Sequence, residues 1–234
     1  MKKYLLSLAF ILLIPTLSLA GEKSDDPMLT MVMVNQFELQ LTGGDDLLVW
    51  GAEGWIGKDL NKFWLKSSGE YVDSKMENAE IQALYSRAIA PFWDLQLGWR
   101  HDIRPTPTRD WMTLGLKGLS PYFFDIDMAL FVGDNGRTSA RLQAEYEVML
   151  TQRLILVPEI EMNLYGKNDP ATGTGSGLSD IEAGLRLRYE VRREFAPYIG
   201  VNWTRMYGNT ADYARDEGAD VDDIQFLIGV RAWF

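Results

Sequence analysis

A run of strict alternation over residues 178–191 constrains the fold more than any other feature of this sequence. On one side of the run lie the apolar residues Ile181, Ala183, Leu185, Leu187, Tyr189 and Val191. On the other side lie Asp180, Glu182, Gly184, Arg186, Arg188 and Glu190. A repeat of two residues is typical of a β-strand and does not fit the repeat of a helix. The run exceeds the roughly five or six residues usual in soluble sheets, and it is long enough to cross a bilayer obliquely.

The same alternation recurs along the chain and predicts twelve strands. The predicted strands span residues 29–42, 47–57, 62–70, 79–90, 93–104, 111–119, 122–133, 138–149, 153–166, 179–191, 195–207 and 223–234. No segment shows a helix pattern of useful length. Because an open sheet edge cannot persist in hydrocarbon, the sheet must close on itself. The sequence therefore predicts an all-β protein, a single closed antiparallel transmembrane β-barrel over residues 29–234.

The connections between the predicted strands alternate between short and long. Tight turns at residues 58–61, 91–93 and 119–121 alternate with long polar segments such as 167–179 and 208–222. Short turns at one end and long loops at the other are typical of outer-membrane barrels, whose short turns face the periplasm. Aromatic residues concentrate near the strand ends, as an interfacial belt requires. An even number of strands then places both termini on the periplasmic side of the outer membrane.

The start of the chain predicts export. Residues 1–20 combine a basic start, an apolar run and the small-residue ending Ser18-Leu19-Ala20, which predicts a cleaved secretory signal peptide rather than a membrane anchor. Residues 21–28 would then form a short periplasmic linker. An exported chain without cysteine has neither a disulfide framework nor a thiolate metal site. The formal net charge of −10 at pH 7 argues against binding to nucleic acid.

Charged residues occupy the inward side of the predicted strands. The acidic residues assigned to the lumen include Glu38, Glu80, Asp102, Asp125, Asp127, Glu145, Glu159, Glu161, Asp180 and Glu182. The basic residues assigned there include Arg100, Arg141, Arg186 and Arg188. Opposite charges that face each other favour a lumen plugged by salt bridges. The excess of acidic residues favours a cation-selective path, and the two interpretations are compatible.

Soft metal ligands are few in this sequence. Met28, Met31 and Met33 cluster where the linker enters the first strand, and thioethers favour monovalent copper. The single histidine, His101, is a second candidate ligand on the outward side near the outer rim. If Glu38 faces the lumen, alternation points Met31 and Met33 toward lipid, where they would be apolar belt residues. One histidine without cysteine excludes the usual zinc and nucleophile arrangements.

Five segments carry a family resemblance: DPMLTMVM, WIGKDLNKFWLK, ALYSRAIAPFWDLQLGWRHD, LTQRLILVPEIEMNLYGKNDP and GSGLSDIEAGLRLRYEVRREFAPYIGVNWTR. They resemble the copper-resistance outer-membrane protein B family over nearly the whole chain that follows the predicted signal peptide. The resemblance implies a barrel of the Gram-negative outer membrane that works with periplasmic copper-handling proteins in copper tolerance or homeostasis. Copper ions are then the expected ligand or transported ion.

The sequence thus leads us to expect a non-enzymatic barrel, embedded in outer-membrane lipid, that binds copper or passes it between the exterior and the periplasm. A channel for another small cation or solute is an alternative with the same architecture. An outer-membrane hydrolase is a further alternative, although the segment HDIRP around His101 contains no serine.

Overall fold

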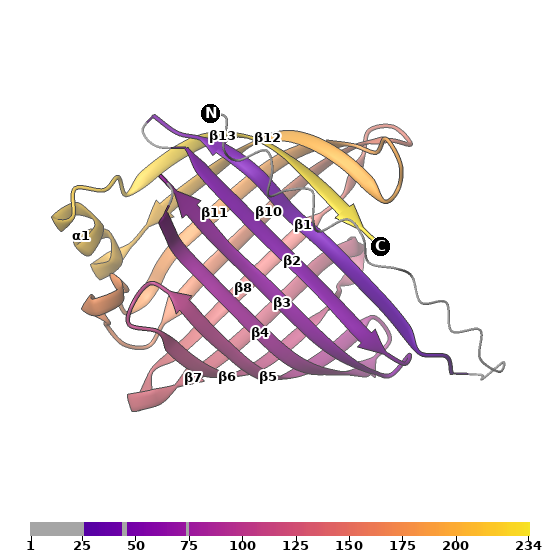
Figure 1. The fold of residues 1–234 in the computed structure, drawn as a ribbon, viewed down its shortest axis with the longest axis horizontal. Helices are drawn as coiled ribbons and strands as arrows, with labels where there is room; N and C mark the ends of the chain where they lie inside the picture. The colour runs from indigo at the N-terminus through magenta and orange to yellow at the C-terminus, as the bar shows by residue number, and fades with distance from the viewer. Residues whose placement is uncertain (1–25, 44–45, 74) are drawn as a thin grey trace.

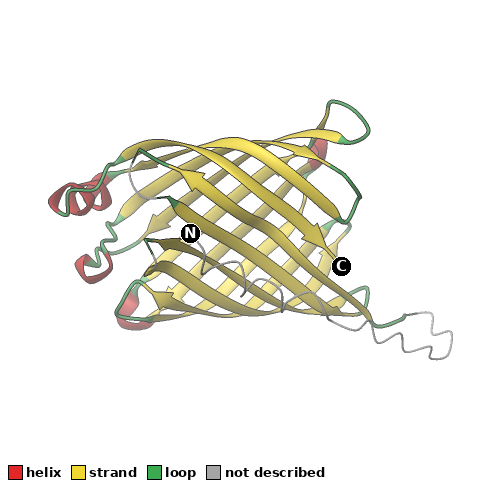
Figure 2. Ribbon diagram, turned by 45° about the horizontal axis from the view of Figure 1, so that its top comes forward, coloured by secondary structure: helices red, strands yellow, loops and turns green. Residues whose placement is uncertain are grey.

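The computed structural model of the protein describes residues 26–43, 46–73 and 75–234, which form one closed β-barrel (Figure 1, Figure 2). The predicted signal peptide, residues 1–20, and most of the predicted linker, residues 21–28, lie outside the described residues. The strands are β1 (Leu29–Leu41), β2 (Leu47–Gly57), β3 (Asn61–Val72), β4 (Lys75–Ala90), β5 (Trp93–Arg104), β6 (Arg109–Leu119), β7 (Phe124–Gly133), β8 (Thr138–Tyr146), β9 (Val148–Met149), β10 (Leu154–Tyr165), β11 (Gly177–Tyr189), β12 (Phe195–Met206) and β13 (Asp222–Trp233). The helical elements are α1 (Gly208–Asp216) and the short 3₁₀ turns η2 (Pro121–Phe123), η3 (Asp134–Gly136) and η4 (Pro170–Thr172).

The sheet closes because the last strand pairs with the first. β13 pairs in antiparallel fashion with both β12 and β1. β8 and β9 are two parts of one barrel strand, since both pair with β10 and only Glu147 separates them. The thirteen labelled strands therefore make a twelve-stranded barrel, and the predicted fold is confirmed. Closure pairs the backbone groups of every strand with those of its two neighbours, as hydrocarbon demands.

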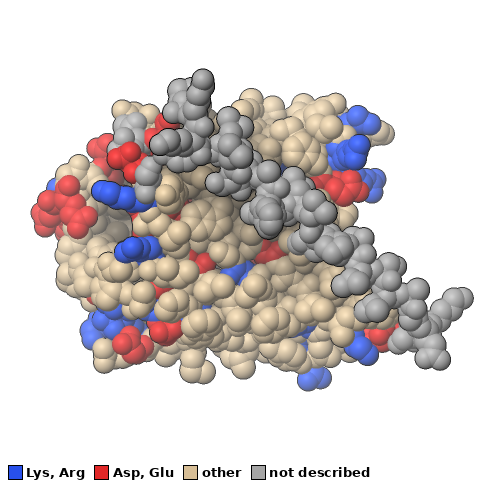
Figure 3. All heavy atoms as spheres, in the orientation of Figure 1, with Lys and Arg blue, Asp and Glu red and all other residues tan. Residues whose placement is uncertain are grey.

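Burial in this barrel is the reverse of burial in a soluble protein. Phe226 and Ile228 in β13 are 65% and 57% exposed, whereas Arg186 and Arg188 in β11 are only 6% and 5% exposed. Apolar side chains thus point outward and charged side chains point into the lumen, as in outer-membrane barrels. On the face shown in Figure 3, charged side chains gather mainly at the two ends, and most of the wall between them is uncharged. None of the described helices is long and apolar enough to cross a membrane.

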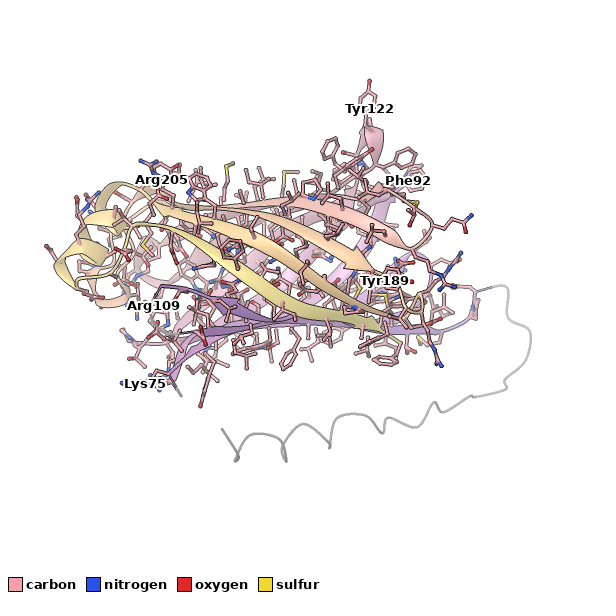
Figure 4. The ribbon with its side chains drawn as sticks, turned by 90° about the horizontal axis from the view of Figure 1, so that it is seen from above. Lys75, Phe92, Arg109, Tyr122, Tyr189 and Arg205 are labelled. Carbon is pink, nitrogen blue, oxygen red and sulfur yellow. The ribbon has the colours of Figure 1, made fainter. Side chains whose placement is uncertain are left out.

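The two ends of the barrel differ in their connections. The end that holds the start of β1 and the finish of β13, called the terminal end below, has tight turns at residues 58–60, 91–92 and 150–153. The opposite end, called the loop end, carries α1, η3 and η4 (Figure 2). Figure 4 shows Phe92, Tyr122 and Tyr189 toward the terminal end, and Lys75, Arg109 and Arg205 at the loop end.

The helix α1 lies in the segment 208–222, where the sequence predicts a connection without helix, so that prediction is wrong. Thr210 and Ala211 are its buried residues. The Thr210 Oγ1 atom accepts a hydrogen bond from the Gly175 N–H at 2.8 Å and lies 3.0 Å from the Ser179 hydroxyl. Contacts with a distant loop therefore hold this helix, and helix periodicity in its own sequence does not reveal them.

Candidate functional site

The structure places every charged residue predicted for the lumen on the inner wall of the barrel. Most of them line a central cavity of about 830 Å³. The others, Glu38, Arg100, Asp102 and Asp180, bond to inner-wall side chains. Their contacts form separate groups along the barrel axis.

The first group surrounds Glu38, which is 1% exposed. Arg186 donates to both carboxylate oxygens of Glu38, at 2.9 and 3.0 Å. The Tyr198 hydroxyl and the Gln40 amide donate to the same carboxylate at 2.9 and 2.7 Å. Arg186 also pairs with Glu159. A bidentate pair with further donors satisfies the buried charge and fixes its geometry.

The second group lies nearer the loop end and is built around Glu80. This carboxylate binds Arg100 at 2.8 Å and Arg141 at 2.8 and 3.0 Å. Arg100 also donates to Asp102 at 2.6 Å. The ring of Phe131 lies 4.6 Å from the Arg100 guanidinium and 5.8 Å from that of Arg141, within cation–π range. Charges from β4, β5 and β8 thereby form one packed layer across the lumen, called the Glu80 layer below.

Two lysines form the third group, in the part of the lumen toward the terminal end. Lys66 binds Asp127 at 2.7 Å, and Lys117 binds Glu53 at 3.1 Å. Lys117 also lies 3.7 Å from Asp127. These pairs connect β2, β3, β6 and β7 across the barrel interior, so they brace its wall as well as balancing charge.

At the loop end, Asp169 bonds to the first residue of β6 and to the connection before β8. Arg109 donates to its carboxylate at 2.8 and 3.0 Å, and Arg137 donates at 3.0 Å. Nearby, the Asn168 side chain accepts a hydrogen bond from the Asn209 side chain at 3.0 Å. The connections that contain η3, η4 and α1 are therefore held to one another outside the Glu80 layer.

The cavity is open toward the terminal end and stops at the Glu80 layer. Its lining includes Phe123 and Met149, which are exposed at the terminal end, and it extends as far as Glu80, Phe131 and Arg141. In the described part of the chain, nine acidic and six basic residues line it. A low-dielectric cavity with an excess of carboxylates attracts cations.

Part of that excess comes from carboxylates without ion pairs. The strand register puts Asp125 opposite Glu145, and Glu145 opposite Glu159. Among the described residues, neither Asp125 nor Glu145 takes part in a salt bridge. The same part of the chain contains no group of three or more His, Cys, Asp or Glu side chains arranged to hold a metal ion. The acidic wall can attract a cation but supplies no ready-made coordination shell.

A β-bulge in β1 changes the assignment of the methionines. The register between β1 and β2 shifts between Val34 and Gln36, which leaves Asn35 as an extra residue. One extra residue moves all preceding side chains to the opposite face of a strand. The prediction that Met31 and Met33 point toward lipid is therefore wrong, because the alternation was extended through the bulge.

The methionines instead contribute to the mouth of the cavity. Met33 lines the cavity, and the Arg231 guanidinium donates to its sulfur at 3.6 Å. Met31 lies two residues earlier on the same face of β1. Met149 lines the same cavity from β9, whereas Met28 precedes β1 and is exposed. The terminal mouth of the lumen thus carries thioethers beside the acidic wall.

His101 is not part of this group, since it lies on the outward face of β5 near the loop end. Its Nδ1 atom is 2.8 Å from the Asp110 carboxylate. Its ring stacks on Trp99 with a centroid separation of 5.5 Å. The structure therefore separates the two predicted kinds of soft ligand by the barrel wall.

An apolar outer wall, a charged lumen, tight turns at one end and loops at the other define an outer-membrane β-barrel protein. A family model described as copper resistance protein B precursor (CopB) matches residues 28–234. The chain belongs to the copper-resistance protein B family.

Two relatives and two solved structures illustrate these similarities. Copper resistance protein B of Escherichia coli is 46% identical over 204 residues, which cover 87% of this chain and 69% of the relative. The homolog of Pseudomonas syringae pv. tomato is 44% identical over 210 residues, covering 90% and 71%. The NanC porin has a TM-score of 0.57 at 10% identity, covering 87% of this chain and 99% of the porin. The KdgM porin has a TM-score of 0.51 at 10% identity, covering 88% and 99%. At this identity, the likeness to the porins shows the fold alone.

Sequence reasoning missed two features of these sites. Met149 was not identified as a cavity residue, although its spacing from Glu145 gives the correct face. The partners of His101 were also missed, because Asp110 is on the next strand and its alignment depends on the register. The contact between His101 and Asp110 requires the pairing of strands in addition to their alternation.

Proposed function

We propose that this chain is a non-enzymatic outer-membrane barrel that binds copper at a periplasmic mouth and receives or passes copper ions in copper resistance. In this proposal residues 1–20 are a signal peptide, residues 21–28 are a linker, and both termini face the periplasm. The tight turns at the terminal end support that orientation. The terminal end would then meet periplasmic copper-handling proteins, and the apolar wall would contact outer-membrane lipid.

The observation that carries the proposal is the lumen-facing position of Met31 and Met33. Thioethers are soft ligands that select monovalent copper over the hard cations favoured by carboxylates. The acidic wall would draw cations into the cavity, and the sulfur atoms would discriminate among them. Arg231 next to Met33 would have to move its guanidinium aside when a cation binds, because like charges repel. Membership of the copper-resistance family supports copper as the cation.

Passage to the exterior would require a further step. The cavity stops at the Glu80 layer, where Arg100 and Arg141 are fully engaged with carboxylates. An ion that crosses the barrel would therefore have to wait for these pairs to rearrange. We propose that the barrel first acts as a periplasm-facing receptor and that passage is gated.

Replacing Met31 and Met33 by Leu tests the thioether site. The change removes sulfur but keeps bulk and apolarity, so the barrel should insert normally. Affinity of the purified barrel for monovalent copper, measured by calorimetry under reducing conditions, should fall by about tenfold or more, equivalent to about 1.4 kcal/mol. The matched control is Met128→Leu, a thioether on the outward face of β7. Equal affinity in the double variant and the control would reject the methionine site.

A general channel for small cations is the second candidate function, and the acidic excess of the cavity favours it. Carboxylates attract many cations without selecting copper. Deletion of the gene followed by growth across copper, zinc and cobalt series separates the two functions. Copper-specific sensitivity supports the first, whereas equal sensitivity to all three metals supports the second. Unchanged phospholipid and peptide turnover in His101→Ala would argue against a hydrolase.

A further inference from the structure

A four-residue unit on the outward wall occurs twice at the loop end. In the first copy, the register pairs Trp99 with Met112 and His101 with Asp110. In the second copy, it pairs Trp203 with Ile224 and Arg205 with Asp222. In both, the indole N–H donates to the carboxylate, at 3.0 Å for Trp99 and 2.9 Å for Trp203. A tryptophan bonded to a carboxylate suits the membrane interface, where one end of the ring is apolar and the other meets water.

The two copies differ at the same two positions. In the second copy, Arg205 binds Asp222 at 3.3 Å, and Ile224 occupies the remaining corner. In the first copy, histidine replaces the arginine and methionine replaces the isoleucine. The second copy shows that arginine and isoleucine satisfy the interfacial role of this unit. The first copy departs from it only by gaining an imidazole and a thioether, two groups that suit copper as metal ligands.

The contacts of His101 orient its imidazole ring so that the second ring nitrogen, Nε2, can bind a ligand. Nδ1 lies 2.8 Å from the Asp110 carboxylate, and the ring stacks on Trp99 at an interplanar angle of 23°. A carboxylate on one imidazole nitrogen fixes the tautomer and orientation that present the other nitrogen to a metal. Asp110 thus acts as the orienting group, and Nε2 becomes the available donor.

Met112 supplies the second donor on the same surface. Its side chain is 69% exposed on the outward face of β6. It lies on the diagonal from His101, and diagonal neighbours about 7–8 Å apart are within reach of long side chains. We propose that His101 Nε2 and Met112 Sδ bind one soft monovalent cation at the loop-end rim, with Asp110 holding the imidazole. This site is separated from the lumen thioethers by the barrel wall and does not depend on the proposed function.

Exchanging the differing residues between the two copies tests the site. Silver(I) serves as a redox-inert probe of soft-ligand binding. All variants carry Met31→Leu, Met33→Leu and Met149→Leu, so that the thioethers at the terminal mouth of the lumen do not contribute. In that background, calorimetry of the purified barrel in detergent should detect one silver ion that is lost in H101R/M112I. This double change recreates the second copy, so the barrel should keep its gel mobility and sheet content.

The reverse exchange places histidine and methionine in the second copy and tests whether they create a new binding site. R205H/I224M in the same background should bind one additional silver ion. Asp110→Asn should weaken the first site while retaining both donors, because the imidazole loses its orienting charge. An unchanged number of bound ions in H101R/M112I would overturn the proposal. If the Met31→Leu and Met33→Leu variant keeps its copper affinity, the proposed function is rejected. That outcome does not affect the silver site at His101 and Met112.

Discussion

The two halves of the lumen use the same residue types for opposite purposes. Toward the loop end, Glu80 and Asp102 are buried and bonded to arginine. Toward the terminal end, Asp125 and Glu145 face an open cavity, and among the described residues they form no salt bridge. The difference shows that charge count alone does not determine what a lumen does.

Pairing is the property that separates these two sets of carboxylates. A carboxylate held by two guanidinium groups is neutralised and fixed, and its removal leaves part of the buried positive charge unbalanced. A carboxylate without a partner keeps its field and can attract a mobile cation. The Glu80 layer therefore closes the lumen. Asp125 and Glu145, beside the lysine pairs of the terminal half, supply a negative potential.

The largest expected effect comes from removing the central carboxylate of the Glu80 layer. Glu80→Ala leaves Arg100 and Arg141 without their shared carboxylate and should destabilise the barrel by about 3–5 kcal/mol. The unfolding temperature should fall, as measured by the temperature at which the faster-migrating folded band is lost in gel electrophoresis. Conductance of the barrel in planar bilayers should rise, because the packed layer across the lumen is lost.

Glu145→Ala is the matched control, since it removes a lumen carboxylate that has no salt bridge among the described residues. Its unfolding temperature and conductance should stay close to those of the parent. If the two variants behave alike, the distinction between paired and unpaired lumen carboxylates is wrong.

An intermediate effect is expected where the loops are joined. Asp169→Asn weakens the hydrogen bonds from Arg109 and Arg137, and bonds of this charged type contribute about 1.5–3 kcal/mol. The loop end should then become more susceptible to limited proteolysis while the strands stay protected. Asp212→Asn is the control, because its pair with Arg215 is largely exposed and contributes little. Equal cleavage of both variants would contradict a joined loop end.

The smallest effect is expected for the lumen carboxylates that form no salt bridge among the described residues. Asp125→Asn together with Glu145→Gln should change stability by about 0.5 kcal/mol or less. Copper affinity at low ionic strength should weaken several-fold, and the difference from the parent should fade in salt because screening removes the long-range attraction. Calorimetry at two salt concentrations measures this. A loss of affinity that does not depend on salt would indicate direct coordination by these carboxylates.

The sequence predicted the parts of this structure that depend on local repetition. Alternation is a property of each strand, so it gave the number of strands and placed Glu80, Arg141 and His101 on the faces that the structure shows. It did not reveal that Arg141 reaches Glu80 across 61 residues of sequence, because strand order and side-chain reach decide that contact. It failed at Met31 and Met33 because Asn35 interrupts the period, and only pairing with β2 exposes the interruption.

The environment of Glu38 has a consequence for how the barrel is assembled. Glu38 is on β1, whereas its partners Arg186 and Tyr198 are on β11 and β12, so the contacts reach over β13. Gly229 permits this, because a Cβ there would come within 2.6 Å of the Tyr198 ring and 2.7 Å of the Glu38 Cβ. Glu38 and Arg186 are 148 positions apart, and contacts between residues so far apart in sequence are slow to form because closing the intervening chain costs entropy. Glu38 can therefore bond to Arg186 and Tyr198 only after the first strand has paired with the last. The burial of this one charge thus accompanies the closing of the barrel.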